Sequence, residues 1–217
     1  MQKKVVILGD SGVGKTSILL RYIQNKFEGS NLPTLGASFK SQMIQLPNEN
    51  DQIKLNLWDT AGQEKFKSLT RMYYQDAEAA IIVYDITFRE SFDSAKNWIE
   101  DLRNNANVPD ILVAMVGNKC DLTDEAEVAL EEAISFARSV KAEIIKETSA
   151  KDATGISELF LEIAQKLYKK QKAIEIQNKP ASGGTGAQKP QPTKLQNSNS
   201  MAGGKSGGKQ GKGGCCK

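Results

Sequence analysis

An eight-residue glycine loop near the N-terminus constrains the fold most strongly. Residues 9–16 read GDSGVGKT and satisfy the pattern G-x-x-x-x-G-K-[ST]. The loop follows a short apolar run, Val5–Leu8, and precedes Lys15–Gln24, where apolar residues recur at helical spacing. A strand, a glycine loop and a helix in this order predict a phosphate-binding loop, in which backbone amides and the helix N-terminus receive the anion. Lys15 supplies a charge to the outer phosphates, and Thr16 supplies an oxygen for Mg²⁺.

Alternating strand and helix patterns continue to about residue 170. Period-two alternation on either side of PNEND predicts a hairpin, and two near-continuous apolar runs predict strands that are buried on both faces. Together the patterns predict an α/β fold with a mostly parallel sheet and helices on both sides. The expected strands are Val5–Leu8, Phe39–Leu46, Ile53–Trp58, Ala79–Tyr84, Ile111–Gly117 and Glu143–Ile145, and the expected helices include Lys15–Gln24, Ser91–Leu102 and Ile156–Tyr168.

Charge and glycine separate the chain into two parts. Residues 171–217 contain eight Lys and one Glu, a net charge of +7, so residues 1–170 carry −4 of the total of +3. Ten of the 18 glycines also lie in those last 47 residues, which have too few apolar side chains to offset their ordering entropy. We therefore expect one folded domain at 1–170 and a flexible Lys/Gly-rich tail at 171–217. The tail lacks aromatic residues and arginine clusters, so a nucleic-acid partner is not expected.

Several classes of protein are excluded by what the sequence lacks. No apolar run approaches the ~18–20 residues of a transmembrane helix, and the N-terminal apolar stretch is too short for a secretory signal. The chain contains no histidine, which excludes His-based catalytic triads and metal sites with histidine ligands. Its three cysteines form neither a disulfide framework nor a zinc-type spacing.

A second loop, WDTAGQE at residues 58–64, follows the predicted hairpin. Asp59 lies at the end of an apolar strand, where a carboxylate can hold Mg²⁺ through water. Gly62 has no side chain to keep its N–H group from a terminal phosphate, and Gln63 is placed to orient an attacking water. The D-x-x-G pattern alone fits a surface turn better. Its position one hairpin after the phosphate-binding loop favours the chemical interpretation.

Two further loops follow predicted strands and indicate recognition of a base. Asp121, in NKCD at 118–121, can accept hydrogen bonds from the ring N1–H and the exocyclic amine of guanine, a donor pair that adenine lacks. Backbone amides of SAK at 149–151 can meet the base oxygen. Alone, NKCD also fits an Asx turn or a helix cap, and SAK has almost no specificity. All four loops lie at the carboxyl ends of strands, where ligands bind in such sheets, and their order predicts a guanine-nucleotide site.

In these motifs the sequence resembles the Ras superfamily of small GTPases, and within it the Rab family, over residues 3–170. GDSGVGKT, Thr34-Leu35-Gly36, WDTAGQE, NKCD and ETSAK correspond in chain order to the guanine-nucleotide motifs of that superfamily. The resemblance implies a small G domain of the P-loop NTPase class with a six-stranded sheet, the cofactors GTP/GDP and Mg²⁺, and hydrolysis of GTP to GDP and phosphate. It implies that Gln63 and Lys15 are catalytic, that Thr16, Thr34 and Asp59 bind the metal, and that the nucleotide is bound by Ser11, Gly12, Val13, Gly14, Lys15, Thr16, Ser17, Phe27, Thr34, Gly62, Asn118, Lys119, Asp121, Ser149, Ala150 and Lys151.

Other segments are similar to Rab proteins in particular. Phe39, Trp58 and Tyr73 match three aromatic residues that Rab proteins present to effectors, although the residues by themselves favour ordinary packing. LGASF at 35–39 and SAKNW at 94–98 look most like the early-endosomal Rab subfamily, which implies a regulator of endocytic vesicle transport and fusion. The chain departs from that subfamily in lacking an N-terminal extension and in a slightly longer PNEND turn, but no departure falls on a residue required for hydrolysis.

The chain ends in Gly214-Cys215-Cys216-Lys217, which is not a C-a-a-X signal. Alone, the pair fits two unmodified thiols about as well as two anchors. In a Rab-like chain it implies geranylgeranyl groups on Cys215 and Cys216, and two lipid chains anchor a protein stably where one does not. We therefore expect the protein at the cytoplasmic face of membranes, at the early endosome, cycling with the cytosol.

The resemblance also implies the partners. They are a guanine-nucleotide exchange factor, a GTPase-activating protein, a GDP-dissociation inhibitor, a prenyltransferase with its escort protein, and effectors, all acting on a monomeric G domain. No arginine of the glycine loop or of the Thr34 segment is placed to act in cis, so slow intrinsic hydrolysis is expected, with a partner's arginine accelerating it about 10³–10⁵-fold. The alternatives are a P-loop kinase of small molecules, disfavoured by NKCD and by the absence of an Arg-rich lid, and a non-hydrolysing nucleotide-bound scaffold, disfavoured by Gln63 and Thr34.

Overall fold

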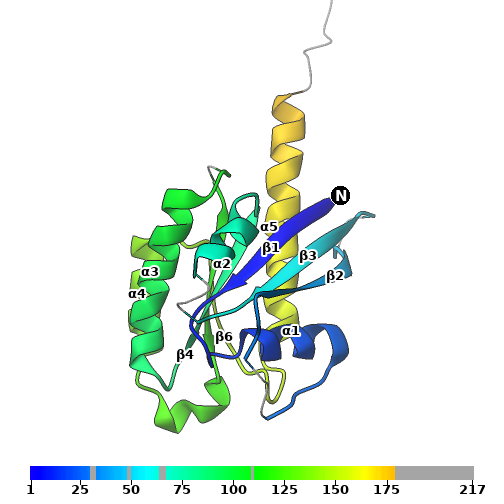
Figure 1. Ribbon diagram of the computed structural model, residues 1–217. Coiled ribbons are helices and arrows are strands. Elements are labelled where there is room, and N and C mark those ends of the chain that lie inside the picture. Colours follow the sequence, from blue (N-terminus) through cyan, green and yellow to red (C-terminus); the bar gives the residue numbers. More distant parts are fainter. Residues whose placement is uncertain (30–32, 48–49, 64–66, 109, 179–217) are drawn as a thin grey trace, which may run out of the picture. The chain divides into compact units, whose positions relative to one another are not determined.

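A single sheet organises the folded part of the chain. The computed structural model describes residues 1–29, 33–47, 50–63, 67–108 and 110–178. Within these residues the sheet has the order β2-β3-β1-β4-β5-β6, in which only β2 and β3 are antiparallel (Figure 1). This confirms the predicted α/β fold with a mostly parallel six-stranded sheet. The strands are β1 (Gln2–Leu8), β2 (Ala37–Gln45), β3 (Gln52–Thr60), β4 (Ala79–Asp85), β5 (Leu112–Asn118) and β6 (Ile144–Thr148).

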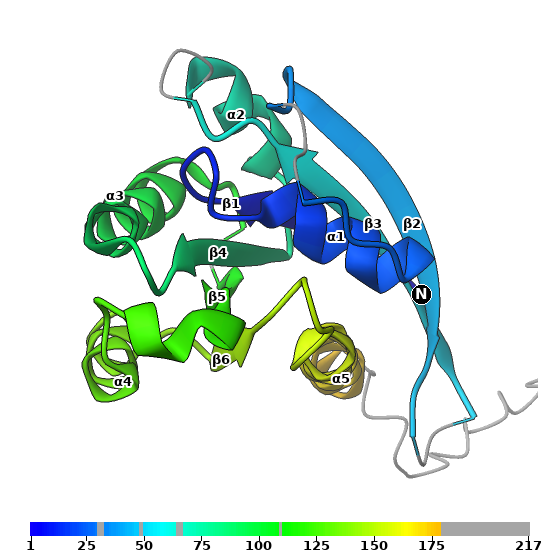
Figure 2. The same cartoon turned by 90° about the horizontal axis from the view of Figure 1, so that it is seen from below.

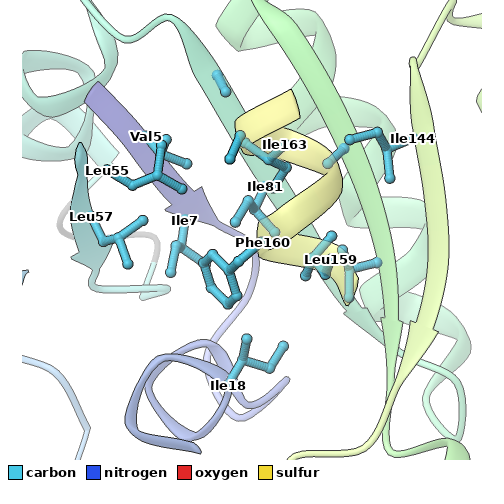
Figure 3. Close-up of a cluster of buried hydrophobic side chains, with 14 of the residues drawn as sticks. Val5, Ile7, Ile18, Leu55, Leu57, Ile81, Ile144, Leu159, Phe160 and Ile163 are labelled. Atoms are coloured by element: carbon cyan, nitrogen blue, oxygen red, sulfur yellow. The ribbon is translucent and has the colours of Figure 1, made fainter. Parts of the chain in front are cut away.

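Helices cover both faces of the sheet, as Figure 2 shows. One apolar cluster joins β1 to α1 and α5, and Figure 3 shows Phe160 of α5 close to Ile7 of β1 and Ile18 of α1. The residues of β1 that point to the other face, Val6 and Leu8, belong to a second cluster with α2, α3 and α4. The alternation of side chains along β1 therefore builds both layers of the core. The helices are α1 (Lys15–Gln24), α2 (Lys67–Tyr74), α3 (Arg89–Asn105), α4 (Leu130–Ser139) and α5 (Ile156–Gln177), and a 3₁₀ turn spans Cys120–Glu125.

The strand register brings the four sequence motifs to the end of the sheet at which the parallel strands have their carboxyl termini. Ile7, just before the glycine loop, pairs with Asp59 of β3. Asn118, at the end of β5, pairs with Asp85 of β4 and Thr148 of β6. Because these strands are parallel, the loops that follow them meet at the same end of the sheet.

The last helix is longer than its apolar pattern predicts. The buried apolar residues of α5 end at Tyr168, but the helix continues to Gln177, so the predicted boundary at residue 170 falls inside it. Asp51, before β3, accepts a hydrogen bond from the Tyr168 hydroxyl at 2.6 Å and lies 3.5 Å from the Lys172 ammonium. The last part of α5 is therefore linked by polar contacts to the residue that precedes β3. The tail predicted to be flexible lies outside the described residues from residue 179 on.

Two helices, α2 and α4, were not predicted from the sequence. The buried face of α4 consists of Ala133 and Ala137, whose small side chains leave a weak periodic signal. The helix α3 contains the predicted helix at Ser91–Leu102 and extends beyond it at both ends. The added residues, 89–90 and 103–105, are polar and leave no apolar pattern from which to predict them.

Candidate functional site

A cavity of about 510 Å³ opens where the four motif loops meet. Most of the residues that were predicted to bind nucleotide line it, but Val13 and Ser149 are buried and are not among the lining residues. Four lining residues, Glu28, Gly29, Pro33 and Leu122, belong to no motif and were not predicted. The lining consists of Ser11, Gly12, Gly14, Lys15, Thr16, Ser17, Phe27, Glu28, Gly29, Pro33, Thr34, Gly62, Asn118, Lys119, Asp121, Leu122, Ala150 and Lys151.

Left-handed glycines shape the phosphate-binding loop. Gly14 has a φ of +98° directly before α1, a conformation that a side chain disfavours. A Cβ on Gly14 would also overlap the side-chain amide of Asn118. That amide donates from Nδ2 to the Val13 carbonyl oxygen at 2.8 Å, and Asn118 is only 2% exposed. Asn118 therefore fastens the glycine loop to the end of β5, a contact that the sequence did not indicate.

Lys15 is a buried cation beside this loop. Its Nζ donates to the carbonyl oxygens of Gly9 at 2.8 Å and Asp10 at 2.7 Å, and the residue is 6% exposed. Desolvation by burial lowers the pKa of Lys15 to about 8, and the carboxylates of Asp59 and Asp10 oppose the shift only in part. Because the protein compensates the ammonium incompletely, an anionic ligand in the cavity would be strongly favoured.

Thr16, Thr34 and Asp59 converge on one point. The hydroxyl oxygens of Thr16 and Thr34 are 2.9 Å apart, and Thr16 Oγ1 donates to Asp59 Oδ2 at 2.7 Å. Asp59 is fully buried, and its Oδ1 has no hydrogen-bond partner within the described part of the chain. Desolvation by burial raises the pKa of Asp59, while the hydrogen bond from Thr16 and the charge of Lys15 act against this.

This donor set fits Mg²⁺. The cation prefers oxygen ligands and is usually held by one or two carboxylates together with water and phosphate oxygens. A cation at this point would compensate the buried Asp59 oxygen that lacks a partner and would favour the ionised carboxylate. The three residues predicted to bind the metal are therefore brought together.

Gly62 approaches the phosphate-binding loop from the end of β3. A Cβ at this position would overlap the backbone of Asp10 and the ammonium of Lys15, so only glycine fits. Gln63 follows it but does not line the cavity and is partly exposed. Its role in orienting water stays a prediction. Residues 64–66 lie outside the described part of the chain.

The candidate base-binding residues gather at the other end of the cavity. Asp121 accepts a hydrogen bond from the Ser149 hydroxyl at 2.7 Å and lies 3.4 Å from the Lys151 ammonium. Ser149 Oγ in turn accepts a bond from the Lys151 amide at 3.2 Å. These contacts fix the position of a carboxylate whose side chain is 14% exposed. Two adjacent acceptor oxygens in a fixed position match the two adjacent donors of guanine.

Lys119 forms an ion pair with Asp85, a residue that was not predicted from the sequence to belong to the site. It has a φ of +67°, and its ammonium pairs with a carboxylate oxygen of Asp85 at the end of β4. Asp85 also accepts hydrogen bonds from the amide and the hydroxyl of Thr87, at 2.9 and 2.8 Å. The signal was present in the sequence, because Asp85 ends an apolar run just as Asn118 does. Only the strand register shows that Asp85 lies beside Asn118, the residue before Lys119.

The three predicted effector residues form a continuous aromatic group. The ring centroids of Phe39 and Trp58 are 5.1 Å apart, and those of Trp58 and Tyr73 are 5.4 Å apart. Phe39 is 50% exposed. Leu35 and Met72, which are close to Phe39 and Tyr73 in the chain, are 81% and 66% exposed. Ordinary packing alone does not account for so much exposed apolar surface, which is typical of a protein-binding site.

The predicted lipidation sites lie outside the described residues. Cys215 and Cys216 belong to this undescribed segment, so their modification stays a prediction. A search of the described helices finds none with the length and apolarity that a bilayer span requires.

Comparison with known proteins agrees with this geometry. A model of the Ras family matches residues 4–169. The Ras-related protein Rab-22A of Mus musculus is 48% identical over 183 residues, which cover 84% of this chain and 89% of that protein. Rab-22A of Homo sapiens is 49% identical and Rab-31 of Homo sapiens 47% identical, each over 164 residues that cover 76% of this chain and 82% of the relative.

Proposed function

Because the chain belongs to the Ras family, and within it to the Rab GTPases, we propose that it is a GTP/GDP-dependent switch in endocytic vesicle transport and fusion at the early endosome. Family membership confirms the resemblance and the GTPase activity predicted from the motifs. It favours the GTPase over the small-molecule kinase that the sequence left open.

One observation carries the nucleotide assignment. Lys15, a buried cation, and Asp121, a fixed pair of acceptors, line the same cavity, and Asn118 links the loops that bear them. The phosphates lie against the loop at 11–17 and against Gly62, and the base lies against Phe27 and the loops at 118–121 and 149–151. Thr16, Thr34 and Asp59 would hold Mg²⁺, and the bound cation would supply positive charge against the phosphate oxygens.

The identity of the bound nucleotide tests this assignment. The full chain is purified without added nucleotide and denatured, and the released ligand is identified by chromatography and mass. Near-stoichiometric GDP or GTP is expected. An adenine nucleotide would overturn the role of Asp121, and a protein that is empty and cannot be loaded with GTP in Mg²⁺ would overturn the switch.

Hydrolysis proceeds by in-line attack of water on the γ-phosphorus of GTP. The water oxygen bonds to the γ-phosphorus, and the bond from phosphorus to the bridging oxygen breaks with its electron pair going to GDP. One water proton stays on the phosphate and the other is released to solvent, so the products are GDP, hydrogen phosphate and a proton. Gln63 orients the water, and Lys15 with the amides of the glycine loop stabilises the charge on the phosphoryl oxygens. None of the cavity-lining residues in the described part of the chain is an arginine. An activating partner therefore supplies the arginine, with an acceleration of about 10³–10⁵-fold.

Gln63→Leu is expected to slow intrinsic hydrolysis about tenfold or more, because leucine cannot hold the water. GTP affinity is expected to stay within about threefold, because the proposed role of Gln63 is with the attacking water and not with a group of the nucleotide. Phosphate release from protein preloaded with GTP, in a single turnover, measures the rate. Gln42→Leu, at an exposed glutamine of β2, is the control. Unchanged kinetics in the Gln63 variant would exclude its role with water.

The nucleotide state is read at the aromatic group of Phe39, Trp58 and Tyr73. Thr34 and Gly62 line the phosphate end of the cavity, so loss of the γ-phosphate removes contacts on both sides of this group. Effectors bind the exposed apolar surface around it when GTP is bound. The exchange factor, the activating protein and the GDP-dissociation inhibitor act on the same switch, and the G domain is a monomer.

A lipid anchor places the switch on the cytoplasmic face of the early endosome. A prenyltransferase with its escort protein adds two geranylgeranyl groups, on Cys215 and Cys216. Two chains give stable anchoring, and extraction by the GDP-dissociation inhibitor returns the protein to the cytosol.

The double substitution Cys215→Ser and Cys216→Ser is expected to abolish membrane association and leave GDP binding unchanged. Both proteins are produced in eukaryotic cells that prenylate Rab proteins, and the membrane-bound fraction is measured by flotation. Cys120→Ser is the matched control, because it removes the half-buried thiol of the folded part. Flotation of the double variant with membranes would contradict the anchor.

A further inference from the structure

Arg21, in the last turn of α1, connects this helix to the loop at 149–151 and to Asn25 at the helix end. Its Nε donates to the Ala150 carbonyl oxygen at 2.8 Å, and its Nη2 donates to the Lys151 carbonyl oxygen at 2.7 Å. Its Nη1 lies 3.1 Å from both the backbone oxygen and the side-chain Oδ1 of Asn25. One guanidinium therefore binds four acceptors on two chain segments outside its own turn.

The helix that carries Arg21 is firmly packed. The next residue, Tyr22, stacks on Phe160 of α5 with ring centroids 3.9 Å apart and an interplanar angle of 14°. Ile18 and Leu19 of the same helix are fully buried (Figure 3 shows Ile18 and Phe160). Whatever Arg21 binds is therefore attached to the core of the domain.

Both segments bound by Arg21 lead to the base end of the cavity. Ala150 and Lys151 line it directly. Asn25 ends α1 in a left-handed conformation, with a φ of +52° and its amide bonded to the Arg21 carbonyl oxygen at 3.0 Å. Two residues later, Phe27 also lines the cavity.

We propose that Arg21 is a positioning residue for the guanine base, which holds the 149–151 loop and the approach to Phe27 in place and so slows the release of GDP. The inference rests on the proposed function, since it requires guanine in this part of the cavity. Arg21 is not among the residues that line the cavity. It acts through the carbonyl groups of Ala150 and Lys151. The amides of the same two peptide units, on Lys151 and Asp152, donate to Ser149 Oγ, and the Ser149 hydroxyl donates to the carboxylate of Asp121.

The contact pattern requires the planar fork of arginine. A guanidinium donates in several fixed directions at once, whereas the ammonium of lysine is a compact point charge. Arg21→Lys keeps the charge and much of the length but cannot satisfy both carbonyl groups and Asn25 in the same geometry. The lysine variant therefore shows whether the several fixed donor directions of arginine are needed or whether a positive charge is sufficient.

The test measures release of a fluorescent GDP analogue from the full chain in the presence of Mg²⁺ and excess unlabelled GDP. Arg21→Ala and Arg21→Lys are both expected to accelerate release about tenfold or more, because bonds from a charged donor to the loop are lost. Arg138→Ala, at an exposed arginine in the last turn of α4, is expected to behave like the wild type. Single-turnover cleavage of preloaded GTP and the unfolding temperature with saturating GDP are recorded for each variant.

The outcomes separate positioning from a general structural role. Faster release in both Arg21 variants, with cleavage of bound GTP changed less than about twofold, supports the proposal. Wild-type release in Arg21→Ala, or its full restoration by Arg21→Lys, would overturn it. If GDP release became faster while GTP cleavage became slower and the unfolding temperature fell, Arg21 would only stabilise the fold. If the wild type itself failed to retain guanine nucleotide, the proposed function would fail instead.

Discussion

Lys15→Met is expected to have effects of opposite sign on nucleotide binding and on the stability of the nucleotide-free protein. Methionine keeps the length and apolar volume of the side chain but removes the charge. GDP affinity is expected to fall about 10²–10⁴-fold, since charge-assisted bonds to phosphate are among the strongest hydrogen bonds in proteins. Titration with a fluorescent GDP analogue measures this loss.

The stability gain follows from the pKa of Lys15, which burial lowers from 10.5 to about 8. Below pH 8 the folded protein without nucleotide carries a desolvated ammonium, at a cost of about 3 kcal/mol. Leaving the Gly9 and Asp10 carbonyl groups without their donor offsets part of the gain, so a net increase of about 1–2 kcal/mol is expected at pH 7. Between pH 8 and 10.5 the unfolded chain binds more protons than the folded one, so wild-type stability rises and the advantage of methionine shrinks.

Urea unfolding of nucleotide-free protein in chelator, at pH 7 and at pH 9.5, measures this second effect. Lys40→Met is the control, because Lys40 is an exposed lysine of β2. If Lys15→Met destabilised the nucleotide-free protein, the bonds to Gly9 and Asp10 would dominate and Lys15 would have a structural role. If GDP affinity changed less than tenfold, Lys15 would not be a phosphate ligand.

Asp121→Asn is expected to shift the base preference of the site from guanine towards xanthine. The carboxylate offers two acceptors, whereas the amide offers one acceptor and one donor. A donor that faces the exocyclic amine of guanine leaves both groups unpaired, so GDP affinity is expected to fall about 10²–10⁴-fold. Xanthine carries an oxygen at that position, and its nucleoside diphosphate is therefore expected to bind the variant more tightly than it binds the wild type.

Competition of GDP and the xanthine analogue for each protein measures the exchange. Asp124→Asn, an exposed carboxylate of the same 3₁₀ turn, is the control and is expected to keep the guanine preference. The exchange requires no change at the phosphate end, so the two ligands also test whether the variant is folded. Unaltered GDP affinity in Asp121→Asn would contradict the assignment of Asp121 to the base.

The parts of the site that the sequence predicted are those carried by short contiguous motifs. Gly14, Lys15 and Thr16 are adjacent in the chain, and their spacing reflects the geometry of one turn. The structure places Asp121 in the lining of the cavity and Asp59 against Thr16, which lines it, and each comes at or soon after the end of a strand that the periodicity predicts. The sheet order then brings these loops together, as expected for a parallel sheet.

The parts that were missed depend on pairs that are distant in sequence. Arg21 and Ala150 are 129 residues apart, and Trp98, whose Nε1 donates to Asp10 Oδ1 at 2.9 Å, is 88 residues from its partner. No local pattern marks such a pair, since a single arginine in a helix or a tryptophan on an apolar face fits ordinary packing equally well. Only the fold shows which of these side chains support the site.

The hydrogen bond between Asn118 and Val13 has a consequence for how nucleotide leaves. It holds the glycine loop and the end of β5 in a fixed relative position, so the proposed sites for the phosphates and for the base would act as a bivalent receptor for one ligand that carries both groups. Once one half is bound, the other sees an effective concentration in the millimolar range or above, and avidity exceeds either separate affinity by about 10²–10⁴-fold. A partner that displaces only the loops around the base, or only those around the phosphates, removes this whole advantage. A local displacement is therefore sufficient for fast nucleotide exchange, and the entire cavity need not open.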